Sequence, residues 1–237
     1  MVGRAPIAVA LDAPDLETAA RWAGLVTPHV SALKIGLELY LRYGPEVVAS
    51  VRGASGAQIF LDLKLDDIPV TVAGAARAVA RLRPALLTVH AAAGAAAIKA
   101  AAEAIPAAKI VAVTVLTSLG EADLARLGVA GPVSSAVRRL AALAVESGAR
   151  GVVCSPQEVT AVRAEVGDDI MLITPGVRPA GSDANDQARV ATPEEALRSG
   201  ADLLVIGRPI TGAADPGAAA AAIAASLRRS ESDAVRR

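Results

Sequence analysis

Four charged residues fall within the six-residue stretch Asp62-Leu-Lys-Leu-Asp-Asp67. The run Phe60–Leu65 is otherwise apolar and predicts a β-strand. Because side chains alternate along a strand, Phe60, Asp62 and Lys64 face one side and the leucines face the other. Opposite charges in a buried strand are costly unless they are paired. Flanking carboxylates favour the charged ammonium, so Lys64 suits proton donation better than Schiff-base formation.

A second lysine, Lys34, lies inside another short apolar strand, Ser31–Gly36. Only four of the 24 basic residues are lysines, yet Lys34 and Lys64 both lie in the interior of apolar strands. A structural ion pair between Asp62 and Lys64 is the alternative to a catalytic pair. A second strand lysine near the same end of the sheet favours a functional site.

Eight apolar strands, separated by helices, are predicted along the chain. They span residues 6–12, 31–36, 60–65, 85–90, 109–116, 150–154, 170–174 and 201–206. Continuous apolar strands that alternate with helices indicate a parallel sheet covered by helices. Eight such units predict an α/β fold, the (β/α)8 or TIM barrel, with residues 1–237 as one domain and 228–237 as a frayed tail. An open doubly wound sheet is the alternative, but it calls for a glycine-rich turn where the chain has Asp12–Asp15.

Local signals place several of the helices. Asp15 is suited to N-capping the first helix, which ends near Val26. One helix is expected from Leu37 to Arg52 and a closing helix from Asp215 to Leu227. Thr192-Pro-Glu-Glu195 has the pattern of a capping box.

Active sites of such barrels lie at the C-terminal ends of the strands. The polar residues predicted there come from all parts of the chain: Asp12, Lys34, Asp62, Lys64, Asp67, His90, Thr117, Arg178 and Arg208. His90 could be a catalytic base or a core histidine. Asp67 could help to start the next helix, but Ile68 directly precedes Pro69 and takes the N-cap position.

Two arginines follow the seventh and eighth strands, where barrels often bind phosphate. Arg178 and Arg208 can each grip phosphate oxygens with two hydrogen bonds, and Gly207 allows close approach of the backbone. Tight turns with solvated arginines are the alternative. The long polar loop 176–191 predicts a lid, with an ordinary surface loop as the alternative.

Composition excludes several classes of function. The formal net charge is zero, which argues against nucleic acid or an anionic membrane as a partner. The single cysteine, Cys154, excludes an internal disulfide framework, and no side-chain spacing predicts a metal site. Neither a signal peptide nor an uncharged apolar span is evident, so we expect a cytoplasmic protein.

The stretch Asp62–Thr71 closely resembles the Asp-x-Lys-x-x-Asp-Ile-Pro-x-Thr signature of the orotidine 5'-phosphate decarboxylase family. The resemblance covers nearly the whole chain, in family order, through Ala10–Asp12, Leu33–Gly36, Thr88–His90, Val115–Ser118, Pro175–Pro179, Asp186–Gln187 and Ile206–Ile210. It implies conversion of orotidine 5'-phosphate to UMP and CO2 in de novo pyrimidine biosynthesis, without a cofactor or metal.

The resemblance also implies the catalytic roles. Lys64 would protonate C6 of the pyrimidine as CO2 departs, and Asp62 would lie beside the departing carboxylate. The alternating charge array would comprise Lys34, Asp62, Lys64 and Asp67. In the family the residue matching Asp67 comes from the other subunit, so a homodimer with shared sites is implied, in which Ile68 and Thr71 cross with it.

Substrate-binding roles follow from the same resemblance. Asp12 and Lys34 would hold the ribose hydroxyls, and Thr117 would lie near the pyrimidine. Phosphate binding and lid closure would fall to Arg178, Gln187, Gly207 and Arg208.

Three other functions fit part of the pattern. A sugar-phosphate enzyme of the same superfamily shares Asp-x-Lys-x-x-Asp, but it uses Mg2+ and a glutamate on the second strand, where this chain has Lys34. A Schiff-base aldolase would use Lys64 covalently. A non-catalytic sensor would bind a phosphorylated ligand without turnover.

Overall fold

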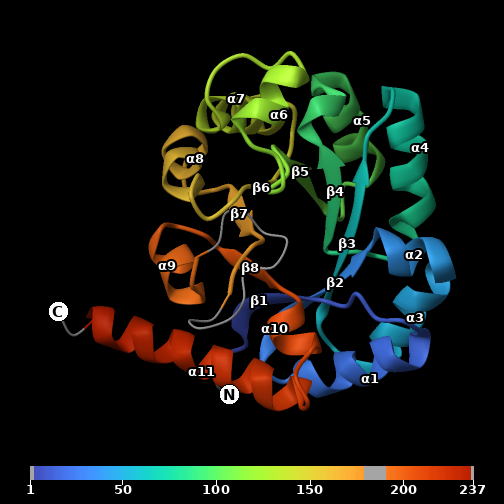
Figure 1. The fold of residues 1–237 in the computed structure, drawn as a ribbon. Coiled ribbons are helices and arrows are strands. Elements are labelled where there is room, and N and C mark those ends of the chain that lie inside the picture. Colours follow the sequence, from blue (N-terminus) through green and yellow to red (C-terminus); the bar gives the residue numbers. More distant parts are fainter. Residues whose placement is uncertain (1–2, 179–190, 236–237) are drawn as a thin grey trace.

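A closed barrel of parallel strands forms the centre of the computed structural model, which describes residues 3–178 and 191–235. The strands are β1 (Ala5–Ala10), β2 (Val30–Gly36), β3 (Gln58–Leu65), β4 (Leu86–His90), β5 (Lys109–Val113), β6 (Gly151–Val153), β7 (Met171–Thr174) and β8 (Leu203–Ile206). Each strand pairs with the next, and β8 pairs with β1 (Figure 1). The predicted (β/α)8 barrel is confirmed, and the open doubly wound sheet is excluded.

Helices surround the barrel (Figure 1). They are α1 (Leu16–Val26), α2 (Leu37–Tyr43), α3 (Pro45–Ala54), α4 (Pro69–Ala80), the 3-10 turn η1 (Ala91–Ala93), α5 (Ala95–Ala104), α6 (Glu121–Arg126), α7 (Val133–Glu146), α8 (Val159–Val166), α9 (Pro193–Arg198), α10 (Arg208–Thr211) and α11 (Pro216–Val235). The predicted caps are confirmed. Asp15 accepts a hydrogen bond from the Thr18 N–H at 2.7 Å, and Thr192 and Glu195 form the capping box.

Two helix predictions were wrong. The single helix expected from Leu37 to Arg52 is broken into α2 and α3, because Gly44 adopts a φ of +56° and Pro45 cannot continue the preceding helix. The closing helix does not end at Leu227. It runs to Val235, so most of the stretch 228–237 is helical, and no glycine or proline interrupts the sequence there.

Side-chain alternation divides the apolar residues into two cores. The barrel interior is filled by Ala8, Ala32, Phe60, Leu86, Val111, Ile173 and Leu203. Leu61 and Leu63 belong to the larger core between strands and helices, so the alternation predicted for β3 is confirmed there. This interior layer is apolar and filled. On β2, β3 and β4, the side chain two positions after each interior residue also faces inward. These side chains lie above the layer, at the C-terminal mouth of the barrel.

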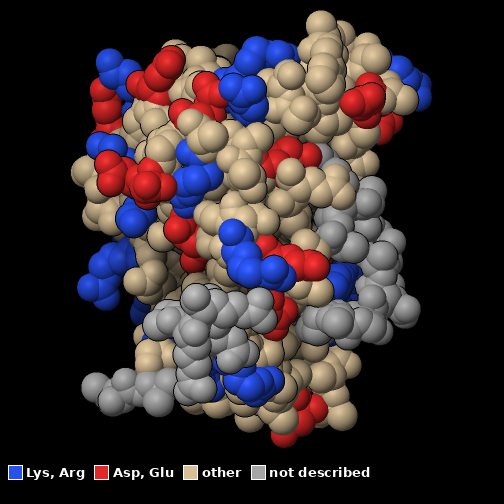
Figure 2. Space-filling model, turned by 90° about the vertical axis from the view of Figure 1, so that its left-hand side faces the viewer, with Lys and Arg blue, Asp and Glu red and all other residues tan. Residues whose placement is uncertain are grey.

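Within the described ranges no helix is long and apolar enough to cross a bilayer. On the face shown in Figure 2, positive and negative side chains are interspersed rather than gathered into a field of one sign. This distribution agrees with the formal net charge of zero.

Candidate active site

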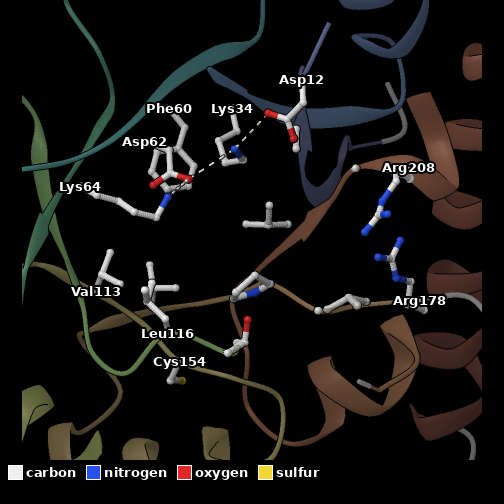
Figure 3. Close-up of a pocket in the computed structure, with 18 of the residues that line it drawn as sticks. Asp12, Lys34, Phe60, Asp62, Lys64, Val113, Leu116, Cys154, Arg178 and Arg208 are labelled. Carbon is white, nitrogen blue, oxygen red and sulfur yellow. Dashed lines mark hydrogen bonds and ion pairs between the residues drawn. The ribbon is translucent and has the colours of Figure 1, made fainter. Parts of the chain in front are cut away.

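A cavity of about 310 Å3 lies at the C-terminal ends of the strands, within the size range of small-molecule sites. Its lining runs from a cluster of acidic and lysine side chains to a pair of arginines (Figure 3). The residues from the predicted site that line it are Asp12, Lys34, Asp62, Lys64, Thr117, Arg178, Gly207 and Arg208. Val113, Val115 and Leu116 contribute apolar surface. The cavity therefore offers a charged end, an apolar wall and a cationic end.

A chain of alternating charges forms the first end of the cavity (Figure 3). The Lys64 Nζ donates to Asp62 Oδ2 at 2.8 Å, and the Lys34 Nζ lies 3.3 Å from the same oxygen. The Lys34 Nζ also lies 3.7 Å from Asp12 Oδ1. Lys34 and Asp62 are each only 8% exposed. Mutual pairing offsets the cost of burying these charges and fixes their positions.

Asp62 is held in its anionic form. Burial opposes its ionisation, but the charges of Lys34 and Lys64, with hydrogen bonds from Lys64 and Thr88, hold the pKa of Asp62 below its ordinary value. A fixed anion therefore lies beside two cations at a buried position, where electrostatic interactions are stronger than in water.

Two features of this cluster were not foreseen from the sequence. Lys64 has a φ of +48°, a left-handed conformation that non-glycine residues rarely adopt. Thr88, which is fully buried, accepts a hydrogen bond from the Lys64 N–H at 2.8 Å and donates one to Asp62 Oδ1 at 3.1 Å. Alternation along β4 could have indicated Thr88, because Leu86 faces the barrel interior and Thr88 lies two residues further on.

Arg178 and Arg208 face each other at the opposite end of the cavity (Figure 3). Burial, and then the neighbouring charge of Arg208, lower the pKa of Arg178 from its ordinary value. The Arg178 Nε is buried and makes no hydrogen bond to any described residue. Two adjacent guanidinium groups of like charge form a site that a doubly charged anion such as phosphate would stabilise.

Three predicted residues lie outside the cavity lining. Asp67, Ile68 and Thr71 are exposed at the start of α4, and Ile68 occupies the N-cap as expected. The Asp67 carboxylate accepts the Ile68 N–H at 2.6 Å. Gln187 and positions 179–190 of the predicted lid lie outside the described residues.

His90 ends β4 and does not line the cavity, which agrees better with a packed histidine than with a catalytic base. Burial lowers the pKa of its imidazole. Within residues 3–178 and 191–235 no group of three or more histidine, cysteine or acidic side chains is arranged to hold a metal ion.

Known proteins resemble this chain over nearly its whole length. Residues 5–223 match the sequence profile of the orotidine 5'-phosphate decarboxylase / HUMPS family. The chain belongs to this family. An orotidine 5'-phosphate decarboxylase of Thermobifida fusca is 71% identical over 225 residues, covering 95% of this chain and 97% of the relative. An orotidine 5'-phosphate decarboxylase of Frankia casuarinae is 60% identical over 242 residues, covering 95% of this chain and 88% of the relative.

A solved structure supports the same family assignment. The crystal structure of orotidine 5'-phosphate decarboxylase from Lactobacillus acidophilus superposes with a TM-score of 0.82 at 38% identity, covering 94% of this chain and 99% of that one. The family predicted from the sequence, and with it the carboxy-lyase class, is confirmed.

Proposed function

We infer that this chain converts orotidine 5'-phosphate to UMP and CO2, the decarboxylation for which its family relatives are named. The observation that carries the inference is the buried Lys34–Asp62–Lys64 cluster, in a cavity that ends in two arginines. The cavity thus offers fixed charges for a reacting carboxylate and a cationic site for a distant phosphate.

We propose that Lys64 and Asp62 carry the chemical step. The C6–carboxylate bond breaks, CO2 leaves, and the bonding electron pair remains on C6. The Lys64 ammonium, 2.8 Å from Asp62, stabilises this carbanion and donates its proton to form the new C–H bond. The anion of Asp62 repels the substrate carboxylate, and the repulsion ends when CO2 leaves. This step needs no oxidant, reductant or group acceptor, in keeping with a cofactor-free reaction.

Binding of the remainder of the substrate follows from the two ends of the cavity. We propose that Arg178, Arg208 and the backbone at Gly207 hold the phosphate, with Gln187 assisting from the predicted lid. Asp12 and Lys34 then hold the ribose hydroxyls, and Thr117 lies near the pyrimidine. Phosphate binding far from C6 supplies binding energy that can be used at the reacting centre.

We further propose a homodimer in which Asp67, Ile68 and Thr71 complete the partner's site. All three are exposed and lie outside their own chain's cavity lining. Ile68 and the nearby Val70 are 62% and 68% exposed, and a second copy of the chain would bury this apolar surface. A cytoplasmic location, and the absence of nucleic-acid and membrane partners, stay predictions from the sequence.

An absorbance assay with orotidine 5'-phosphate tests the catalytic assignment. We expect turnover by the wild type and a loss of about 100- to 10,000-fold in Lys64→Ala, because the proton donor is removed. Lys99→Ala is the matched control, since the Lys99 side chain is 70% exposed and its only salt bridge to a described residue is with Glu103. Retention of activity in Lys64→Ala would contradict the proposal.

The rival functions give different results in the same samples. Loss of activity with EDTA and recovery with Mg2+ would indicate the sugar-phosphate enzyme. Borohydride trapping of substrate on Lys64 would indicate the aldolase. Binding of UMP by a wild type that does not turn over substrate would indicate the sensor.

A further inference from the structure

Thr88 links the two residues to which the chemistry is assigned, although it does not line the cavity itself. It lies in β4 and is fully buried. Its hydroxyl has one hydrogen, which is donated to Asp62 Oδ1 at 3.1 Å, and its oxygen accepts the Lys64 N–H at 2.8 Å. The Thr88 hydroxyl thus acts as a hydrogen-bond donor to one member of the charged cluster and as an acceptor for another.

The bond to Lys64 acts on a backbone in an unusual conformation. Lys64 has a φ of +48°, and the pairing of β3 with β4 changes register between Leu61 and Leu65. At this irregularity the Lys64 N–H bonds to the Thr88 side chain. Sparsely populated backbone conformations persist only where the surroundings hold them. The direction in which the Lys64 side chain leaves the strand therefore depends on this bond.

The bond to Asp62 fixes the plane of its carboxylate. Both lysines approach the same oxygen, Oδ2, at 2.8 Å from Lys64 and 3.3 Å from Lys34. Thr88 is bound to the other oxygen, Oδ1. Without that bond the carboxylate could turn about its Cβ–Cγ axis while still pairing through Oδ2. With it, each oxygen has a defined partner.

We propose that Thr88 is a positioning residue for the decarboxylation, which holds the Lys64 backbone and the Asp62 carboxylate in the geometry that meets the substrate. The inference rests on the roles proposed for Lys64 and Asp62. Thr88 does not touch the cavity, so its effect is on the chemical step rather than on substrate affinity.

Thr88→Val and Thr88→Ser separate the hydroxyl from the shape of the side chain. Valine keeps the shape and loses both hydrogen bonds, whereas serine keeps the hydroxyl and loses a methyl group. We expect kcat of Thr88→Val to fall about 10- to 100-fold with KM within about threefold of wild type, and kcat of Thr88→Ser to stay within about threefold. Active sites are counted by UMP titration, so that loss of folded protein does not count as loss of kcat.

Equal kcat in Thr88→Val and wild type, or an equal fall in both variants, would overturn the proposal. If Thr88→Val does not fold, Thr88→Ala against Thr88→Ser gives the same comparison, since both lose the methyl group. If neither Thr88→Val nor Thr88→Ala folds while Thr88→Ser is active, Thr88 is a structural residue, and this result would also overturn the proposal. Lys64→Ala in the same assay tests the underlying assignment: an active Lys64→Ala removes that assignment, whereas an inactive one beside an active Thr88→Val removes only the inference.

Discussion

At the scale of single residues, Asp62 determines how the charged end of the cavity is held together. One carboxylate oxygen contacts both Lys34 and Lys64, and the other contacts Thr88. Neutralising Asp62 would leave two cations close together in a largely buried position. The folded protein therefore favours the ionised carboxylate, which makes its stability depend on pH.

In the folded protein the pKa of Asp62 is lowered from its ordinary value of 3.8. The ionised carboxylate therefore contributes its full stabilisation at pH values above 3.8. The stabilisation is lost as the pH falls through the lower folded pKa. Near pH 7 we expect the wild type to unfold at a higher urea midpoint than Asp62→Asn. This difference in midpoint should narrow steadily below about pH 4. Urea titrations from pH 7 to pH 3 measure this difference. A difference independent of pH would contradict the electrostatic account.

Gly36 leaves room for the Lys34–Asp12 pair. A Cβ at this position would lie 3.1 Å from Lys34 Nζ and 3.2 Å from Asp12 Oδ1, while its φ of −88° is open to any residue. Gly36→Ala should therefore displace the pair that we propose holds the ribose, and KM should rise about three- to tenfold. Steady-state kinetics check this, and an unchanged KM would contradict the expected effect of Gly36→Ala. Gly53→Ala is the control, since nothing lies within 4 Å of its added Cβ.

Part of the site was open to prediction from the sequence because strand alternation fixes which side chains share a face. It placed Asp62 with Phe60, and Lys34 in a strand beside them. The left-handed backbone of Lys64 has no sequence signal, since most such positions are glycines. The bond from Thr88 depends on the register between two strands, which a single strand's pattern does not reveal.

At the scale of elements, the strands were predicted well because each is a continuous apolar run. The break between α2 and α3 was missed, although its signal is present in Gly44-Pro45. The apolar spacing on both sides looks continuous, and it outweighed the backbone restriction that proline imposes on its neighbours. The short helix α10 was missed because its four residues also suit a turn.

The C-terminal end of helix α3 offers a test of stability. Gly53 is exposed, lies within α3 and has open space around its missing Cβ. Gly53→Ala should raise the free energy of unfolding by about 0.4–1 kcal/mol, because alanine restricts the unfolded chain more than glycine does. Urea unfolding measures the change, and the decarboxylation rate should not alter. A decrease in stability would mean that the backbone at Gly53 is not helical.

At the scale of the whole molecule, the pairing of β1 with β8 joins the two ends of the barrel. Neither end can leave without opening the sheet, so we propose that residues 1–237 unfold as one cooperative domain. Far-UV circular dichroism and the fluorescence of Trp22, the single tryptophan, should change in one coincident urea transition. Separate transitions for these two signals would contradict a single domain.

The proposed dimer cannot be derived from one chain's pattern of apolar residues, but it predicts a specific result for mixed subunits. In a heterodimer of Lys64→Ala and Asp67→Ala chains, one site lacks both residues and the other has both. Random exchange of equal amounts should therefore restore about a quarter of the wild-type activity from two inactive proteins. A mixture of Lys64→Ala with Asp62→Asn is the matched control. Both of its changes affect residues that line their own chain's cavity, so every site stays defective and no activity should return. Exchange is followed with two affinity tags. If tagged heterodimers form and the Lys64→Ala and Asp67→Ala mixture stays inactive, Asp67 does not reach the partner's site.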